Sequence, residues 1–303
     1  CRCRGHDGCR GAGMSAATDY RPRRSVLYMP SSNERALEKA KTLPVDGLIL
    51  DLEDAVAPDH KATARDNACA AARSGDYGQR EVTIRVNASG TQWHDDDLAA
   101  ACAAGPDGIV VPKVDSAQEV FDLVAAMERH GAPEHTRLWA MIESPAAVLA
   151  VGEIAAASPR LAALVIGTND LVKELGARHV PGREPLLTSL SLALLAARRS
   201  GVAILDGVYN DVTDLDGFVA ECRQGADMGF DGKTLIHPGQ VGPCNEVFAP
   251  SPAEIEDAHA LVAAWDAGAG SGVVTHRGRM VEHLHVEIAR QVIATAQAIA
   301  DRA

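Results

Sequence analysis

Short apolar runs rich in β-branched residues recur along most of the chain, and each is bounded by turn-forming or polar residues. Such a run is typical of a strand that is buried on both faces of a parallel sheet. The pattern predicts eight strands, at Ser25–Met29, Gly47–Asp51, Val82–Val86, Gly108–Val111, Leu138–Ile142, Leu164–Ile166, Val202–Leu205 and Lys233–Ile236.

The stretches between these strands carry apolar residues at three- and four-residue spacing, as helices that cover a sheet require. The predicted helices are Glu34–Thr42, His60–Ser74, Asp95–Ala104, Ala117–His130, Ala146–Ala157, Leu186–Ser200 and Leu215–Met228. This alternation predicts an α/β fold, a (β/α)8 TIM barrel. The alternative is an open doubly wound sheet. That fold normally has a Gly-rich phosphate loop after its first strand, and residues 29–33 do not form one.

A smaller unit is predicted after the barrel. We expect a lead of residues 1–23, a barrel of residues 24–247 and a small C-terminal helical arm of residues 248–303. The arm contains helical patterns at Ala253–Ala267 and Glu282–Arg302, with a hairpin or extended segment at Val273–Val281. It is too small to hold a core by itself, so we expect it to contact the barrel or a neighbouring subunit.

The first residues do not resemble a secretory signal, because they contain no apolar segment. We expect Met14 to be the natural start and the residues before it to be non-native. The alternative is a small zinc site, although Cys1 and Cys3 are spaced poorly for one. Its ligands would be Cys1, Cys3, His6 and Cys9.

Composition narrows the class of partner. The chain has 303 residues, a formal net charge of −12 and no basic tract, which argues against nucleic acid or an anionic membrane. No apolar run is long enough to span a bilayer. The remaining cysteines lie among apolar neighbours and are expected to be reduced core residues of a cytoplasmic protein. They are Cys69, Cys102, Cys222 and Cys244.

Two acidic side chains follow consecutive predicted strands. Glu143 ends one apolar run and Asp170 follows the next. The carboxyl ends of barrel strands meet at one rim, so these carboxylates can converge there. One or two carboxylates, completed by water and substrate oxygens, form the usual protein site for Mg²⁺. The alternative is structural, with Thr168 or Asn169 capping a helix that starts near Leu171 and Asp170 favouring its dipole.

An arginine lies at the end of another buried strand. Arg85 needs a carboxylate partner there, because an unpaired buried guanidinium is costly, and Glu53 or Asp54 is the natural candidate. Arg85 could also clamp a substrate carboxylate or thioester oxygen. We interpret Asp51 and Glu53 as the groups that orient Arg85 and hydrogen-bond metal-bound water. Strand alternation sends Asp54 elsewhere. The nearby acids favour an ion pair or phosphate contact for Lys113 over an imine.

Several short motifs occur in a fixed order over the region from about Arg24 to Arg290. They are Leu27–Pro30, Leu50–Val56, Ile84–Asn87, Val111–Lys113, Ile142–Pro145, Gly167–Leu171 and Gly232–Pro238. In this order the chain resembles the HpcH/HpaI aldolase family, which includes the citrate lyase β subunit and the malyl-CoA lyases. The resemblance implies a TIM barrel that binds Mg²⁺ and makes or breaks a carbon–carbon bond in a 3-hydroxyacyl-CoA.

The resemblance also implies roles for particular residues. Glu143 and Asp170 would hold the metal, and Arg85 would bind the carboxylate or carbonyl end of the substrate. Contacts to CoA or substrate are implied for Tyr28, Arg35 and Lys39, and the backbone around Leu235 and Ile236 would lie near the thioester. Glu282 stands where the family has a catalytic aspartate in an arm that reaches a neighbouring subunit, and the proline that follows in the family motif is missing.

By this resemblance we expect an Mg²⁺-dependent lyase, or a synthase working in reverse. Its substrate would be malyl-CoA, citramalyl-CoA or citryl-CoA, and its products an acyl-CoA and a 2-oxo acid such as glyoxylate, pyruvate or oxaloacetate. The alternatives are a thioesterase of the same family and a non-catalytic subunit that binds acyl-CoA or an acyl carrier. A homo-oligomer, a trimer or a multiple of it, is also expected from the family.

Overall fold

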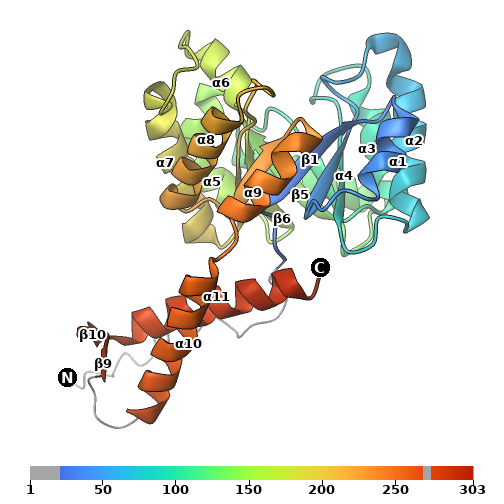
Figure 1. Cartoon of the computed structure of the whole chain (residues 1–303). Coiled ribbons are helices and arrows are strands. Elements are labelled where there is room, and N and C mark those ends of the chain that lie inside the picture. The colour runs from blue at the N-terminus through green and yellow to red at the C-terminus, as the bar shows by residue number, and fades with distance from the viewer. Residues whose placement is uncertain (1–20, 269–273, 303) are drawn as a thin grey trace, which may run out of the picture. The chain divides into compact units, whose positions relative to one another are not determined.

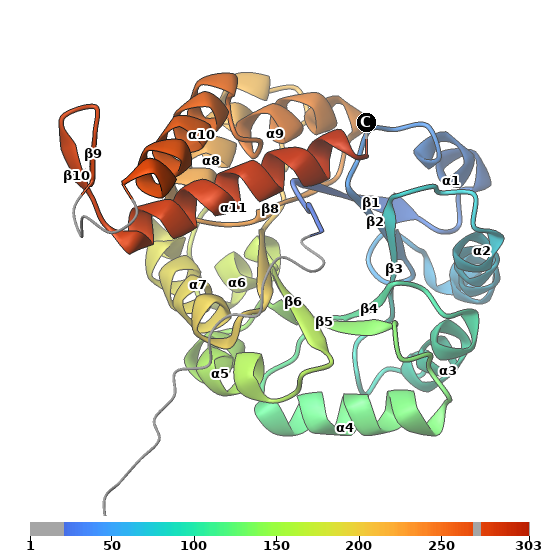
Figure 2. The same cartoon turned by 90° about the horizontal axis from the view of Figure 1, so that it is seen from below.

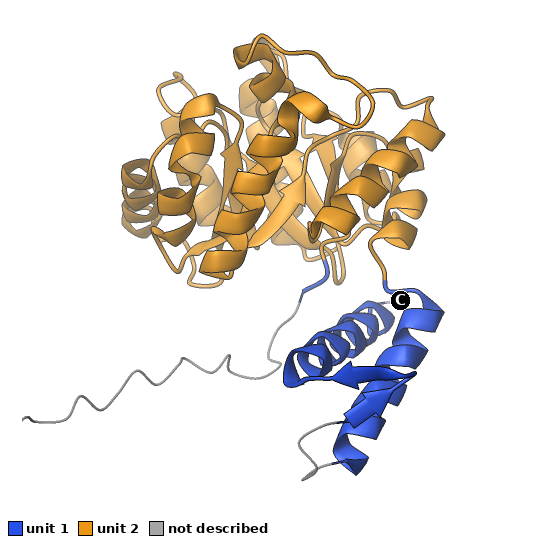
Figure 3. Cartoon of the chain, turned by 90° about the vertical axis from the view of Figure 1, so that its left-hand side faces the viewer, with its two compact units in different colours: residues 1–22, 250–303 blue, residues 23–249 orange. Residues whose placement is uncertain are grey.

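The computed structural model describes residues 21–268 and 274–302. The chain divides into two compact units, which Figure 3 shows in separate colours. One unit runs from Arg23 to Ala249, and the other contains the described residues from Pro250 onward together with Arg21 and Pro22. The proposed ligands of an N-terminal zinc site, and Met14, lie outside the described residues.

The larger unit is a closed barrel of parallel strands in the order β1 to β8, with β1 paired to β8. This confirms the TIM barrel and rules out the open sheet. The strands are β1 Ser25–Pro30, β2 Gly47–Asp51, β3 Glu81–Arg85, β4 Gly108–Val111, β5 Arg137–Ile142, β6 Leu161–Ile166, β7 Ala203–Asp206 and β8 Gly232–Leu235.

Helices surround the strands, as Figures 1 and 2 show. They are α1 Glu34–Ala40, α2 Lys61–Ser74, α3 His94–Ala104, α4 Ala117–Arg129, α5 Pro145–Ala156, α6 Thr168–Glu174, α7 Leu187–Ser200, α8 Leu215–Met228 and α9 Val241–Val247. Short 3-10 turns occur at η1 Pro58–His60, η2 Glu184–Leu186 and η3 Pro238–Gln240. The pattern predicted neither α6 nor α9 as a separate element with bounds.

Strand alternation divides the buried side chains into two clusters. The larger cluster includes Leu48, Leu50 and Leu235 and packs with the surrounding helices. The smaller cluster fills the barrel interior with Val26, Ile49, Val110, Trp139, Met141, Ala163, Val165 and Leu205. One more step of alternation along β1, β2 and β5 directs Tyr28, Asp51 and Glu143 toward the mouth of the barrel.

Over its described residues, the smaller unit consists of two helices and a hairpin. Its elements are α10 Pro252–Ala267, β9 Val274–His276, β10 Arg279–Val281 and α11 His283–Ala300. The two strands pair antiparallel, and Arg277 and Gly278 between them both have positive φ. Two central turn residues in that region are typical of a tight hairpin. No helix within the described ranges is long and apolar enough to cross a membrane.

Candidate active site

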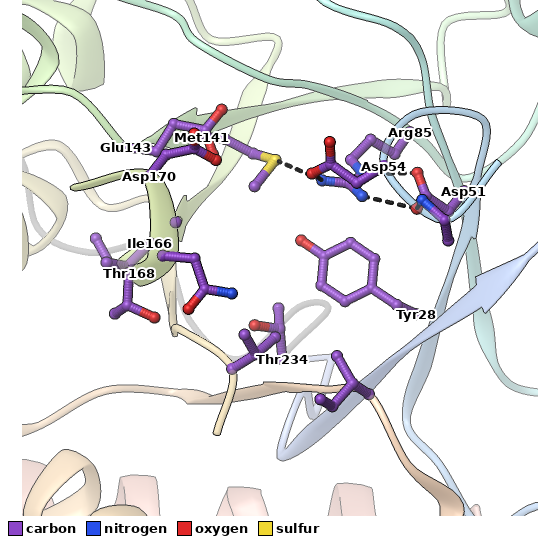
Figure 4. Close-up of a pocket in the computed structure, with 15 residues that line it drawn as sticks. Tyr28, Asp51, Asp54, Arg85, Met141, Glu143, Ile166, Thr168, Asp170 and Thr234 are labelled. Atoms are coloured by element: carbon purple, nitrogen blue, oxygen red, sulfur yellow. Dashed lines mark hydrogen bonds and ion pairs between the residues drawn. The ribbon is translucent and has the colours of Figure 1, made fainter. Parts of the chain in front are cut away.

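A cavity of about 290 Å³ opens at the carboxyl ends of the barrel strands. Its lining combines one guanidinium with several acids and a few apolar side chains (Figure 4). The lining residues are Tyr28, Asp51, Asp54, Ala55, Arg85, Met141, Glu143, Ile166, Gly167, Thr168, Asn169, Asp170, Val208, Thr234 and Ile236. Glu143 and Asp170 lie together on one side in this view, and Arg85 lies with Asp51 and Asp54 on the other.

Arg85 is held by carboxylates from the neighbouring strand and the segment after it. The strand register places Asp51 opposite Arg85, and the Nε and Nη2 atoms of Arg85 donate to the two oxygens of Asp51 at 2.7 Å each. Its Nη1 lies 2.9 Å from Oε2 of Glu53. The Tyr28 ring lies 4.8 Å from the guanidinium carbon. The structure therefore brings Asp51 and Glu53 to Arg85 as the sequence predicts.

Asp54 contacts Arg85, which agrees with its expected role as a possible partner of the guanidinium, but the prediction from strand alternation that Asp54 points elsewhere is wrong. Asp54 lines the cavity, and its Oδ2 lies 3.4 Å from Nη1 of Arg85. The reason is that β2 ends at Asp51, and the chain turns after it. Backbone N–H groups of Glu53 and Ala55 donate to the Asp51 carboxylate at 2.8 and 3.1 Å. Strand alternation no longer applies in such a turn.

Glu143 and Asp170 lie on the opposite wall. Glu143 is 3% exposed, and its Oε1 accepts a hydrogen bond of 2.8 Å from the backbone N–H of Lys113. Gly167 makes room for it, because a Cβ atom at that position would lie 2.3 Å from Oε2 of Glu143. Neither acid caps a helix, although Asp170 lies in the first turn of α6, where the structural alternative has it favour the helix dipole. Ser144 caps α5, and the N-cap of α6 is Gly167, with no side-chain bond.

Burial and neighbouring charges shift the titration of these groups. Burial, reinforced by Asp170, raises the pKa of Glu143 to about 7. Burial also raises the pKa of Glu53 to about 8, against the opposing effect of Arg85. Burial acts to lower the pKa of Arg85, but the Asp51 carboxylate outweighs it, so the guanidinium stays charged. Burial raises the pKa of Tyr28, which keeps its hydroxyl a proton donor.

The Glu143–Asp170 pair fits a hard divalent cation. Within the described part of the chain, neither carboxylate has a lysine, arginine or histidine nitrogen within 4 Å, and no group of three acidic, histidine or cysteine side chains is placed to hold a metal. Two adjacent carboxylates without a cationic partner repel each other, and the charge of Asp170 adds to the effect of burial in raising the pKa of Glu143. Mg²⁺ needs only one or two such ligands, because it retains several waters.

The other predicted site residues are more dispersed. Tyr28 and Ile236 line the cavity, whereas the side chain of Leu235 is buried in the cluster behind β8. Arg35 and Lys39 are exposed on α1 and do not line the cavity. Glu282 is exposed at the start of α11 in the smaller unit, where its backbone N–H donates to Nδ1 of His285 at 3.0 Å.

The ion pair predicted for Lys113 is not found among the described residues. Its side chain is exposed, and no carboxylate oxygen of the described chain lies within 4 Å of its ammonium group. Lys113 has a φ of 55°, and only its backbone N–H reaches the site, through Glu143. The strand ends at Val111, so the lysine lies in a turn where its side chain can leave the cavity.

Met141 and Thr168 are among the residues of the cavity wall that sequence reasoning missed. Met141 lies one alternation step before Glu143, and its sulfur lies 4.0 Å from Nη1 of Arg85. Strand alternation could have identified it. Thr168 is 3% exposed, and its Oγ1 is buried without a hydrogen-bond partner among the described residues. No sequence pattern marks Thr168 as a cavity residue; its position follows from the packing of its methyl and hydroxyl groups near Gly207.

The fold and the site together define an α/β barrel whose rim presents the Arg85 guanidinium on one side of a cavity and the Glu143 and Asp170 carboxylates on the other. The chain belongs to the HpcH/HpaI aldolase/citrate lyase family, whose profile matches residues 24–238. The computed structure therefore agrees with the resemblance drawn from the short motifs.

Characterised relatives of the chain bear the names of more than one activity. It is 51% identical over 284 residues to the (3S)-malyl-CoA thioesterase of Cereibacter sphaeroides, covering 92% of this chain and 96% of the relative. It is 36% identical over 284 residues to the citrate lyase subunit beta of Escherichia coli, covering 91% and 94%.

A solved structure supports the fold over nearly the same length. The protein CitE of Mycobacterium tuberculosis, in complex with magnesium, acetoacetate and coenzyme A, matches with a TM-score of 0.75 and 29% identity. The match covers 91% of this chain and 98% of that one.

Proposed function

We propose that this chain is an Mg²⁺-dependent enzyme that acts on a malyl-CoA-type thioester and that its principal reaction is hydrolysis of the thioester to malate and CoA. One observation carries the proposal. A single cavity presents the Arg85 guanidinium on one side and the Glu143–Asp170 pair on the other. A 3-hydroxyacyl thioester with a terminal carboxylate carries groups that match both sides.

Glu143 and Asp170 would hold the metal. When bound, Mg²⁺ polarises substrate oxygens and offsets negative charge that develops on them. The backbone N–H of Lys113 fixes one oxygen of Glu143, which orients that side chain before any ion binds. Such support for a ligand raises the affinity of a metal site.

Arg85 would bind the carboxylate of the acyl group. Asp51 holds Nε and Nη2 in place, so the guanidinium plane is oriented before the substrate arrives. The exposed Asp54, at 3.4 Å from Nη1, is the weakest of its contacts and the easiest to displace. The Tyr28 hydroxyl is a neutral donor on the same wall and would contact an adjacent substrate oxygen.

The size of the cavity fits this assignment. About 290 Å³ is near the lower end of the range for small-molecule sites. The cavity would therefore hold the short dicarboxylic acyl group, with the larger nucleotide of CoA outside it.

Thioester hydrolysis is favoured over carbon–carbon cleavage by similarity. The relative named as a thioesterase shares 51% of its aligned residues with this chain, compared with 36% for the citrate lyase subunit. In hydrolysis, water attacks the thioester carbonyl, the carbon–sulfur bond breaks and the departing sulfur takes a proton.

Carbon–carbon cleavage is the second candidate. It is favoured by the metal-binding pair itself, because adjacent carboxylates that leave positions open suit a 2-oxo acid bound through two oxygens. Cleavage of malyl-CoA would give acetyl-CoA and glyoxylate. The two reactions use the same substrate, so their products distinguish them.

We propose Glu282 as the base that acts with the barrel cavity of a neighbouring subunit. A complementation experiment tests this assignment. Arg85→Met and Glu282→Gln would each be inactive alone, and mixed oligomers formed by co-expression would regain activity only if the two residues act across subunits. A Glu282→Gln variant with wild-type activity would remove Glu282 from the proposal.

The test of the function is a product analysis with (3S)-malyl-CoA. We expect free CoA and malate in the presence of Mg²⁺ and none after chelation with EDTA. Acetyl-CoA and glyoxylate would support the lyase instead. If the metal-loaded protein turns over no malyl-CoA, citramalyl-CoA or citryl-CoA, the enzyme proposal is wrong and a non-catalytic acyl-CoA-binding role takes its place.

A further inference from the structure

We propose that Lys61 is a positioning residue, which fixes the segment Leu52–Ala55 and thereby holds two of the carboxylates around Arg85. The proposal extends the proposed function, because Arg85 is the expected substrate-binding group. Lys61 does not line the cavity, and it is not one of the proposed metal ligands.

The ammonium group of Lys61 is fully hydrogen-bonded. Its Nζ donates to the backbone oxygen of Leu52 at 2.7 Å, to that of Glu53 at 2.6 Å and to Oδ1 of Asn87 at 2.7 Å. An ammonium group has three donors, and each has an acceptor here. Two of the three acceptors belong to the backbone directly after Asp51, so one side chain ties down the segment that follows β2.

The location of Lys61 is unfavourable for a lysine in other respects. It is the first residue of α2, where the helix dipole favours an acid, and the first turn of α2 contains none. It is 5% exposed, and burial lowers its pKa. No carboxylate oxygen within the described ranges lies within 4 Å of its Nζ. A local cost of this kind is expected where a side chain serves a functional site.

The segment Leu52–Ala55 carries the side chains that contact Nη1 of Arg85. Glu53 lies 2.9 Å from Nη1, and Asp54 lies 3.4 Å from it. The backbone N–H of Leu52 donates to the carbonyl oxygen of Arg85 at 2.9 Å, so the segment also joins β3 directly. Movement of the segment would change both the charge around Arg85 and the contacts of its Nη1 atom.

A second layer holds Lys61 and its partners. The Nδ2 of Asn87 donates to the backbone oxygen of Leu52 at 3.0 Å and to Oδ2 of Asp97 at 2.5 Å. Asp97 is fully buried, and its other oxygen accepts from Nε of Arg65 at 2.7 Å. Arg65 lies one turn after Lys61 on α2, so two side chains of this helix are hydrogen-bonded to the network. The Trp93 ring covers the ammonium at 5.2 Å.

The experiment compares Lys61→Met with Lys41→Met. Lys41 also contributes an ammonium group with two side-chain partners, but these are Glu38 and Asp76 on the exposed surface. We expect backbone hydrogen exchange over residues 52–56 to accelerate at least about tenfold in Lys61→Met, because the loss of hydrogen bonds opens the segment locally. In the same variant kcat/KM for malyl-CoA should fall about a hundredfold. Lys41→Met should change neither quantity by more than about twofold.

Two results would overturn the proposal. One is wild-type exchange over residues 52–56 in folded Lys61→Met. The other is accelerated exchange with an unchanged kcat/KM, which would make Lys61 a structural residue only. If Lys61→Met does not fold, Asn87→Ala replaces it. That variant removes the side-chain oxygen that accepts from Lys61 and the amide group that donates to the Leu52 carbonyl. We expect faster exchange over residues 52–56 and a lower kcat/KM, both by smaller factors than in Lys61→Met. If the wild type turns over no thioester, the proposed function fails, and exchange alone decides whether Lys61 fixes the segment.

Discussion

Replacement of Gly167 by alanine tests the proposed metal-binding role of Glu143 with a single added methyl group. A Cβ at this position would lie 2.4 Å from Cβ of Glu143, whereas carbon atoms in contact stay at about 3.5 Å. Glu143 must therefore move by about 1 Å, and rotation of its side chain cannot relieve a clash at Cβ. The φ of Gly167 is −93°, which alanine adopts freely, so the effect is steric.

A displacement of this size predicts two measurable losses. The free energy of unfolding should fall by about 1–3 kcal/mol, as overpacking of a buried site requires. The value of kcat/KM for malyl-CoA should fall about a hundredfold, together with a weaker Mg²⁺ affinity in calorimetry. Gly152→Ala is the matched control. Gly152 lies inside α5 with no atom near its added Cβ, so alanine should add about 0.5–1 kcal/mol of stability and leave activity unchanged. Wild-type metal affinity and activity in Gly167→Ala would refute the assignment of Glu143.

Three further outcomes are expected. Asp170→Asn should weaken Mg²⁺ binding at least about a hundredfold while the protein stays folded, and an unchanged calorimetric affinity would exclude Asp170 as a ligand. Arg85→Lys should lower kcat/KM for malyl-CoA by about a hundredfold or more, because lysine cannot reproduce the bidentate contact to Asp51 or the planar donor set, and a near-normal value would contradict the anion-binding role. Since the folded-state pKa of Glu53 is about 8 and its ordinary value is 4.5, its protonated form stabilises the fold below about pH 4.5, and this stability is lost as pH rises through 8. In urea denaturation, the free energy of unfolding of the metal-free protein should decline over this pH range, by at most about 1.4 kcal/mol per pH unit. The decline should be smaller in Glu53→Gln, and equal slopes in the two proteins would be inconsistent with the raised pKa of Glu53.

Most of the barrel could be predicted from the hydrophobic pattern, because most residues of every barrel strand are buried. The predicted and observed bounds of β2 and β4 coincide. The strand β6 begins at Leu161, three residues before the predicted start. Its first residues, Leu161, Ala162 and Ala163, follow an alanine-rich helix and lack the β-branched side chains that mark the other strands. The helix α6 spans only Thr168–Glu174, too short for a helical period to stand out.

The candidate site could be predicted where it depends on strand ends. Arg85, Asp51 and Glu143 all follow from alternation, and the structure places each at the cavity. Asp54 could not be predicted in this way, because its direction depends on a turn stabilised by backbone hydrogen bonds to Asp51. Lys61 was missed because its partners are two backbone oxygens and one amide, and backbone acceptors leave no residue-specific pattern in a sequence.

Release of CoA thiol from (3S)-malyl-CoA, followed with and without Mg²⁺ in the wild type and in Glu143→Gln, is the most direct test of the account. We predict rapid release by the metal-loaded wild type, no release after EDTA treatment, and restoration when Mg²⁺ is returned. Glu143→Gln should release no CoA at any Mg²⁺ concentration at which the wild type is saturated. Release that survives EDTA, or that persists in Glu143→Gln, would contradict a metal-dependent site at this rim of the barrel.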